Sequence, residues 1–456
     1  MSLEGAIAAH RFGLGARPGE IDRASRDPKT WLLTQINTPA EAPVPLDGGS
    51  FRTGGELVVE MLQYQREQAM ARRNGGGGDP VKKFFQTRVK MFNDELAARY
   101  AHGFTTDKPF AERLVWFWSN HFVVSAQNPR ATTLVGAFER EAIRPNITGK
   151  FEDMVLAATS HPAMLLYLDN AQSVGPDSTA GQRFGKGRNE NLGRELMELY
   201  TLGVDGGYTQ ADVIAMANIL TGWTLNPAGQ NNGFAYYENR HEPGDVTLRG
   251  RTYPPTLEGG IAAIKDLAND PATARHIAAK LATHFIADVP PPASVARLEK
   301  TFKETRGDLR ALAHAIVEDP AAWTPGAGKM RTPVEYVTAG YRMLDLPKGD
   351  SAATDKQVRG ALAAARLMGQ VPLAPPAPKG WPDTSDAWSG PDAVLMRIEW
   401  AKQVGHAMPP TLDAAAIAEM GMGPLLQPDT KTLMARAESQ SDALAFLICS
   451  PEFQRR

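Results

Sequence analysis

The chain has 456 residues, of which 43% are hydrophobic and 22% are charged, and its net charge is −2. This composition is that of an ordinary globular protein, and the small charge gives no electrostatic reason to expect nucleic acid or an anionic membrane as a partner. The single cysteine, Cys449, excludes an internal disulfide framework and a cysteine-rich zinc site. No stretch approaches the roughly 20 apolar residues that span a bilayer.

The N-terminal stretch MSLEGAIAAHRFGLGARPGE (1–20) has neither the cationic start nor the long apolar run of a secretory signal. The sequence therefore predicts a cytoplasmic protein.

Helical periodicity dominates the chain, because apolar residues recur three and four positions apart in long windows. Helix starts are also marked. Thr209, with Asp212 three residues later, approximates a capping box, and His161 and Asp270 each precede a proline as an N-cap residue would. Strand-like alternation is scarce, and its best example is GFAYYENRHEPGDVTLRGRTYP (233–254).

Four loops interrupt the helical pattern, and one of them is the long, polar, glycine-containing stretch 169–188. RRNGGGGDP (72–80) is rich in glycine and is predicted to be mobile. Residues 226–260 contain the hairpin excursion, and residues 371–391 combine many prolines with two tryptophans, whose burial predicts an ordered loop. We expect a mainly α fold, a single large multi-helix domain over residues 1–456 with a small β-hairpin excursion and long loops.

The stretch FAERLVWFWSNHFVV (110–124) is apolar nearly all round, which predicts a buried helix. His121 lies among aromatic residues near Trp118, either as a satisfied core histidine or as part of a site. Asn120 shares a side with Arg113, and both need partners because each unpaired buried polar group costs about 1–3 kcal/mol. We expect the acidic helix described next to supply them, in a polar network that is either structural or catalytic.

That acidic helix begins the segment 189–202. On a helical projection its charged residues and Asn191 lie on one face and its leucines on the other. Glutamates four residues before and after Arg194 form a ladder that is ordinary on a solvated helix. Alternatively, the three carboxylates of Glu190, Glu195 and Glu198 around Arg194 line a pocket, where their mutual repulsion raises one carboxyl pKa towards general-acid use. Both interpretations remain open at this stage.

Signals for metal or phosphate chemistry are weak. The sequence contains no HExxH, GxSxG or P-loop motif. His276 and His284 would share one helix face, but Lys280 lies between them and disfavours a metal ion. We expect neither a metal nor a cofactor.

Eight stretches of the chain carry a family resemblance, namely RFGLGARPGE (11–20), ERLVWFWSNHF (112–122), TSHPAMLLYLDN (159–170), NENLGRELMELYTLGVDGGYTQADV (189–213), LTGW (220–223), AAKLATHFIADVPPP (278–292), GWPDTSDAW (380–388) and SPEFQ (450–454). Through them the chain resembles, over essentially its whole length, a bacterial family catalogued as domain of unknown function 1800. The resemblance implies a helical protein of about this size and supplies no reaction. Relatives often look like exported proteins and are commonly encoded beside a sulfatase-like family. This copy departs from the exported pattern by lacking a signal, so the periplasm stays open as an alternative to the cytoplasm.

The function we expect is that of a metal-independent, hydrolase-like enzyme with a carboxylate-lined pocket for a polar substrate such as a carbohydrate. Glu195 or Glu198 would act as acid or base, with Asp169 as the second carboxylate, since glycosidase chemistry needs two carboxyls about 5–10 Å apart. The residues expected to bind the substrate are His121, Asn120, Trp118, Asn191, Arg194, Trp223, His241 and Trp381.

A different class of function remains open beside the enzyme. The chain would then be a non-catalytic scaffold or accessory protein, whose tryptophan-containing loop and hairpin excursion bind a partner such as the sulfatase-like protein. A scaffold predicts an exposed acidic face and a protruding loop, whereas an enzyme predicts both around one concavity.

Overall fold

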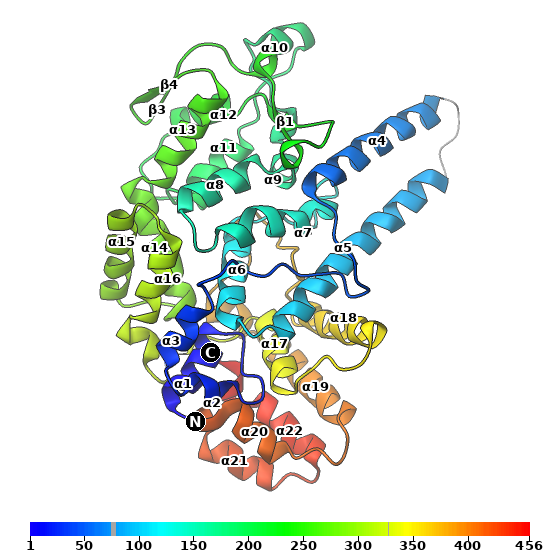
Figure 1. Cartoon of the computed structure of the whole chain (residues 1–456), viewed down its shortest axis with the longest axis vertical. Coiled ribbons are helices and arrows are strands. Elements are labelled where there is room, and N and C mark those ends of the chain that lie inside the picture. Colours follow the sequence, from blue (N-terminus) through cyan, green and yellow to red (C-terminus); the bar gives the residue numbers. More distant parts are fainter. Residues whose placement is uncertain (74–78, 327) are drawn as a thin grey trace.

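α-Helices make up most of the molecule, as the sequence predicts (Figure 1). The computed structural model describes residues 1–73, 79–326 and 328–456. In these residues the chain is 63% helical and forms 23 α-helices and four short strands. Residues 74–78 of the expected mobile loop lie outside the described residues.

The helices are joined by connections that range from a single residue to the 37 residues between Ile219 and Leu257. In the first half they are α1 (Leu3–Ile7), α2 (Glu20–Ala24), α3 (Pro28–Thr34), α4 (Gly54–Arg73), α5 (Asp79–Thr105), α6 (Pro109–His121), α7 (Val135–Phe138), α8 (Phe151–Ser160), α9 (Pro162–Tyr167), α10 (Thr179–Phe184), α11 (Asn191–Glu195) and α12 (Gln210–Ile219). In the second half they are α13 (Leu257–Ala268), α14 (Pro271–Phe285), α15 (Pro292–Thr305), α16 (Leu309–Val317), α17 (Pro333–Met343), α18 (Ser351–Leu367), α19 (Pro391–Ala407), α20 (Ala414–Met422), α21 (Pro428–Ala435), α22 (Gln440–Cys449) and α23 (Pro451–Gln454).

The predicted helix starts are confirmed. Thr209 and Asp212 form a reciprocal capping box at the start of α12. The Asp270 side chain accepts a hydrogen bond from the Ala272 amide at the start of α14, and the His161 ring accepts one from Ala163 at the start of α9. These residues satisfy backbone N–H groups that the first helical turn leaves without partners.

The β-structure consists of two small antiparallel hairpins. Strand β1 (Trp223–Leu225) pairs with β2 (Phe234–Tyr236), and β3 (Val246–Leu248) pairs with β4 (Arg251–Tyr253). The excursion therefore begins at Trp223, three residues before the predicted boundary of 226–260.

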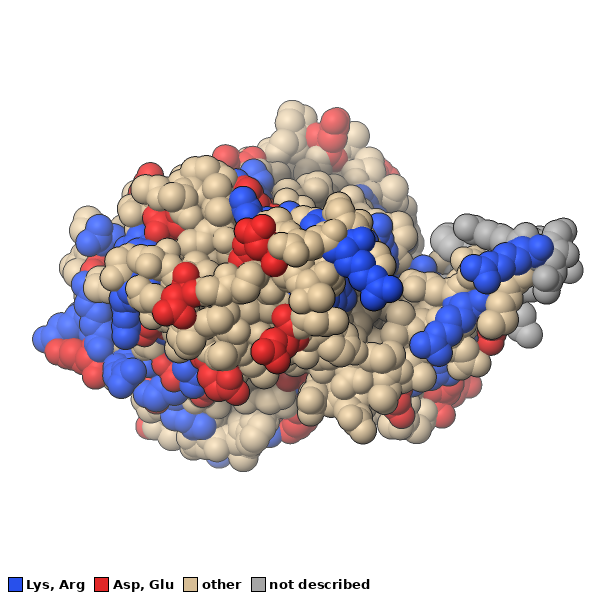
Figure 2. Space-filling model, turned by 90° about the horizontal axis from the view of Figure 1, so that it is seen from above, with Lys and Arg blue, Asp and Glu red and all other residues tan. Residues whose placement is uncertain are grey.

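Helices α4 and α5 form an arm that projects from the other helices (Figure 1). Figure 2 shows the arm from above, with lysine and arginine side chains along its described surface. Among the described helices, none combines the length and the apolar character that crossing a bilayer requires.

Two large hydrophobic clusters, and a third small one near the N-terminus, form the core. The largest contains apolar residues of α6, α8, α9 and α11–α16, and the second contains those of α5, α17–α20 and α22. In Figure 1 the helices of the second cluster lie towards the bottom and right. Trp116 of α6 and Leu373 of the loop 371–391 pack against both large clusters. The junction marked by these two residues is where the candidate site lies.

Candidate functional site

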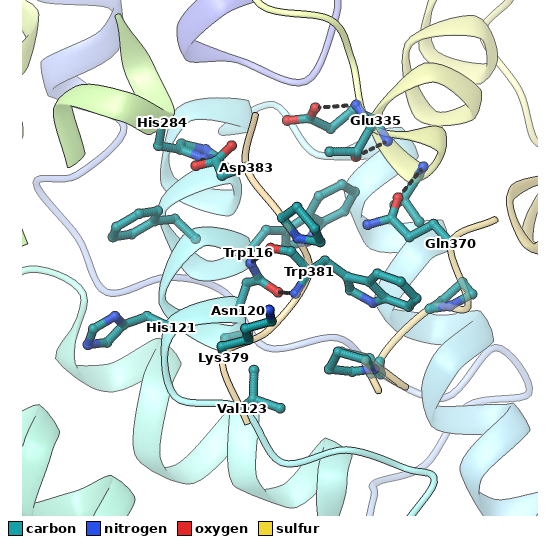
Figure 3. Close-up of a pocket in the computed structure, with 18 of the residues that line it drawn as sticks. Trp116, Asn120, His121, Val123, His284, Glu335, Gln370, Lys379, Trp381 and Asp383 are labelled. Carbon is teal, nitrogen blue, oxygen red and sulfur yellow. Dashed lines mark hydrogen bonds and ion pairs between the residues drawn. The ribbon is translucent and has the colours of Figure 1, made fainter. Parts of the chain in front are cut away.

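A cavity of about 250 Å³ lies at the junction of the two large clusters. Figure 3 shows how α6, α14, the start of α17 and the loop 371–391 surround it. Its walls combine the aromatic side chains of Trp116, Phe117 and Trp381 with polar groups. The polar residues around the cavity include Asn120, His121, Lys280, His284, Glu335, Lys379 and Asp383.

The loop 371–391 is fixed to α6 by a pair of hydrogen bonds (Figure 3). Asn120 Nδ2 donates to the Trp381 carbonyl at 2.9 Å, and the Trp381 amide donates to Asn120 Oδ1 at 2.8 Å. The Trp388 side chain is buried and its Nε1 donates to the Pro382 carbonyl at 3.1 Å. The loop therefore packs onto the helices and brings Trp381 and the residues after it to the cavity.

Glycine is required where this loop meets α6. Gly380 has φ +80°, and a Cβ there would lie 2.4 Å from the Asn120 carbonyl oxygen. Only glycine adopts such a φ without steric cost and also permits so close an approach.

Gly380→Ala is expected to destabilise the protein more than Gly369→Ala. Gly369 has φ +98° with nothing near its added Cβ, so alanine there costs only the strained φ, about 1–2 kcal/mol. At Gly380 the steric collision adds about 1–3 kcal/mol. Urea denaturation of both variants measures the difference, and equal destabilisation would contradict the close contact with Asn120.

His284 and Asp383 form a pair at one end of the cavity (Figure 3). His284 Nδ1 lies 2.7 Å from Asp383 Oδ2. Burial acts to raise the pKa of Asp383, but His284, Lys329 and Arg456 outweigh it and hold that pKa well below its usual range. Asp383 is therefore a carboxylate, which can only accept, so His284 carries its proton on Nδ1.

The other ring nitrogen of His284 is available for chemistry. Nε2 is buried and has no hydrogen-bond partner in the described part of the chain. Burial lowers the pKa of His284 to about 4, against the opposing effect of Asp383. At neutral pH the imidazole is therefore uncharged and Nε2 has a free lone pair, which is the state that a general base requires.

Lys280 lies one helical turn before His284 on α14 and also lines the cavity. It forms no hydrogen bond or ion pair with residues that the structure describes. Burial lowers the pKa of Lys280 to about 8, although Asp383 opposes the shift. The ammonium group is therefore charged at neutral pH and has no bonded counter-ion.

His121 lines the cavity, together with Asn120 and Trp381, two other residues predicted to bind the substrate. Its Nε2 is 3.0 Å from the Tyr200 carbonyl, and its buried Nδ1 lacks a partner among the described residues. Burial, and then Lys280 and His276, hold the pKa of His121 well below its usual value. His121 is a neutral ring between the core and the cavity.

Four buried histidines are expected to make the protein sensitive to mild acid. Burial lowers the pKa from 6.5 to about 3 in His10, to about 4 in His276 and His284, and well below 6.5 in His121. Between about pH 4 and 6.5 the unfolded chain binds protons that the folded chain does not, so stability falls as pH falls. We expect urea denaturation to show a loss of at least about 2 kcal/mol between pH 7 and 5. Equal stabilities at these two pH values would contradict the burial of these histidines in their uncharged form.

The acidic helix at the start of the segment 189–202 does not border the cavity. The expected pairing of Arg194 with Glu190 is confirmed at 3.1 Å, but the Arg194 side chain is 38% exposed, so the pair is a surface pair worth a few tenths of a kcal/mol. Glu198 accepts a hydrogen bond from Tyr208, and Asn191 is exposed. Burial, and then Glu198, raise the pKa of Glu195. None of these side chains lines the cavity.

The remaining predicted residues are also dispersed. Asp169 pairs with Arg130 at 2.5 Å on the surface. Trp118 is buried in the core with its ring centroid 5.5 Å from that of His121, and Trp223 is buried in β1. His241 Nδ1 lies 2.7 Å from the Thr221 carbonyl. The structure thus brings His121, Asn120 and Trp381 together at the cavity and leaves the others apart from it.

The expected partners of the Arg113–Asn120 stripe were wrong. Arg113 Nη1 pairs with Glu335 at 2.5 Å and its Nε donates to the Gly13 carbonyl at 2.6 Å, while Asn120 bonds to Trp381. The acidic helix supplies none of these partners, because α17 and the loop 371–391 cover this side of α6 instead.

Lys280, His284 and Asp383 were not among the site residues predicted from the sequence. The signal available for the first two is the spacing of His276, Lys280 and His284 by four residues, which places them on one face of a helix. In the described residues no group of three or more His, Cys, Asp or Glu side chains is placed to hold a metal ion.

A family model described as protein of unknown function (DUF1800) matches residues 7–455 of the chain. The chain belongs to this family. Searches of curated proteins and of solved structures gave no match. Three of the stretches that resemble DUF1800 meet at the cavity, since Asn120 and His121 lie in ERLVWFWSNHF, His284 in AAKLATHFIADVPPP, and Asp383 in GWPDTSDAW.

Proposed function

We propose that the chain is a hydrolase-like enzyme that acts on a polar substrate, with its active site in the cavity around His284. The observation that carries this proposal is the free Nε2 of a neutral, buried imidazole whose Nδ1 is bonded to the Asp383 carboxylate. A base oriented in this way by a buried carboxylate is the arrangement that hydrolytic enzymes use to activate a nucleophile.

In the proposed reaction, His284 Nε2 takes a proton from a water molecule while the water oxygen bonds to the electrophilic carbon of an ester. The bond from that carbon to the leaving oxygen then breaks, and the imidazolium returns the proton to the departing alcohol. Asp383 holds the ring and stabilises its positive charge during the step. Trp116 and Trp381 offer aromatic surfaces against which a sugar or similar polar ring can pack.

An ester-like bond is favoured over a glycosidic bond because of the state of the carboxyls at the cavity. Glycosidases need one carboxyl that stays protonated as a general acid. Burial acts to raise the pKa of Glu335, but Arg456 and Arg113 outweigh it and hold the pKa well below its usual range, and Asp383 is held low in the same way. Neither group can serve as that acid near neutral pH.

Glu195 on the acidic helix remains the rival acid or base, because its raised pKa is an observation in its favour.

The scaffold hypothesis has mixed support. The acidic face is half-exposed, as a scaffold requires, but Trp388 is buried and Trp381 lines the cavity, as an enzyme requires. A sulfatase-like partner therefore stays the alternative proposal.

A panel of chromogenic acetate and butyrate esters, acetylated sugars and glycosides tests the proposal. The wild type should hydrolyse at least one ester, and Asp383→Asn should lower the rate by about 100-fold or more because the imidazole loses its orientation. Asp386→Asn, in the same loop at an exposed position, is the matched control and should have little effect. If Glu195→Gln abolishes activity while Asp383→Asn does not, the acidic helix is the site. No hydrolysis anywhere in the panel would count against an enzyme of this class.

A further inference from the structure

We propose that the cavity binds an anionic group of its ligand, a carboxylate, sulfate or phosphate, on the ammonium group of Lys280. Because this proposal specifies the class of substrate, it rests on the proposed function. The binding itself can be measured without any reaction.

The charge on Lys280 has no bonded counter-ion of its own. The nearest elements present imidazoles to it, namely His276 and His284 on α14 and His121 on α6, and burial keeps all three neutral at pH 7. Asp383 of the loop 371–391 is the one carboxylate that acts on Lys280. A partly buried ammonium in such surroundings gains most from an anion that enters the cavity.

Asp383 is already committed to other cations. His284 lies 2.7 Å from one of its oxygens, Lys329 Nζ 3.1 Å from the other, and Arg456 Nη2 3.5 Å from that same oxygen. The second carboxylate at the cavity, Glu335, is likewise paired with Arg113 and Arg456. Of the carboxylates that the structure describes at the cavity, neither is therefore free to neutralise Lys280.

A second lysine favours the entry of an anion. Lys379 is exposed, lines the same cavity (Figure 3), and forms no ion pair with residues that the structure describes. Two unpaired lysines beside carboxylates that are already paired make the potential in the cavity positive, which attracts anionic ligands.

The position of Lys280 relates the bound group to the proposed base. Lys280 and His284 lie four residues apart on α14, so they lie on one face of the helix and serve one small ligand. A bound anion beside His284 would also stabilise its protonated form, raising its pKa towards the range in which a base works well at neutral pH. The same group would thus anchor the substrate and strengthen the base.

Calorimetric titration of the full-length chain with acetate, sulfate and phosphate, against chloride at equal ionic strength and pH 7, tests this proposal. The wild type should bind at least one of the three anions saturably and more tightly than chloride. Lys280→Met should weaken that binding by about tenfold or more, since a charge-assisted hydrogen bond is lost, whereas Lys280→Arg should retain it. Lys402→Met, on the surface of α19, is the matched control.

Circular dichroism and the thermal midpoint establish that each variant is folded. Equal binding by the wild type and Lys280→Met would overturn the proposal, as would the absence of saturable binding of all three anions by the wild type. His284→Ala should still bind the anion, because the imidazole is the base and not the anchor. Binding that depends on Lys280 supports the anion site even if no ester is hydrolysed, so the two proposals can fail separately.

Discussion

Replacing His284 with alanine is expected to lower kcat/KM by about 10²–10⁴-fold on any ester that the protein hydrolyses, because that is the contribution of a positioned general base. The loss should appear in kcat with little change in KM, since Nε2 acts on the attacking water rather than on the bound substrate. Steady-state kinetics on the most active ester of the panel measures it.

The matched control is His276→Ala. His276 lies two turns earlier on the same face of α14, and its Nε2 is 3.1 Å from the Leu199 carbonyl, away from the residues that line the cavity. This variant should keep kcat within about threefold of the wild type. If His284→Ala keeps its activity, or if both variants lose it equally, His284 is not the base.

Replacing Glu335 with glutamine is expected to destabilise the protein by about 3–5 kcal/mol, because two buried arginines lose their common carboxylate. Arg113 lies 2.5 Å and Arg456 3.1 Å from Glu335 Oε1, and the side chains of both arginines are 1% exposed. Glutamine keeps the shape and can still accept the Thr332 amide hydrogen bond at the start of α17, so the charge is the main change. Urea denaturation at pH 7 measures the loss.

The loss of stability caused by Glu335→Gln should depend on pH. Burial favours the protonated acid, but the two arginines outweigh it and hold the pKa of Glu335 well below 4.5 in the folded protein. The stabilisation is therefore complete above the unfolded pKa and disappears as the pH falls below it, so the variant and the wild type should converge only in strong acid.

Glu399→Gln is the control for this charge effect. Glu399 is 49% exposed and lies 3.9 Å from Lys402 on the surface of α19, so its loss should cost less than about 1 kcal/mol. A similar small cost for Glu335→Gln would mean that the buried arginines do not depend on that carboxylate.

The helices could be predicted from the sequence because their signals are local. Thr209 and Asp212 lie three residues apart, and Asp270 directly precedes its helix, so the residues that begin each helix are adjacent in the sequence. The hairpins were harder, since three-residue strands give too little alternation to fix a boundary, and β1 begins at Trp223 rather than in the predicted excursion.

The candidate site could be predicted only in part. His121, Asn120 and Trp381 were identified because polar or aromatic residues in unusual surroundings stand out within one segment. His284 and Asp383 are 99 residues apart, and nothing in either segment indicates that they meet. The acidic helix was wrongly placed at the site. The pattern of its apolar residues shows which side of the helix is buried, but it does not show which element, if any, lies against the charged side.

The contacts that complete the candidate site can form only in a certain order while the chain is synthesised. Arg456 donates through Nη1 to the His284 carbonyl at 2.7 Å, and Arg113 donates to the carbonyl of Gly13, so contacts beneath the cavity join segments from residue 13 to residue 456. At about 5–20 residues per second, a ribosome delivers these two segments roughly 20 to 90 seconds apart. Until residue 456 emerges, Glu335 can pair with only one of its two arginines. Until α23 emerges, the second hydrophobic cluster also lacks the contacts of Phe453. The growing polypeptide should therefore expose part of the second cluster until α23 has left the exit tunnel, and the candidate site should form only after that.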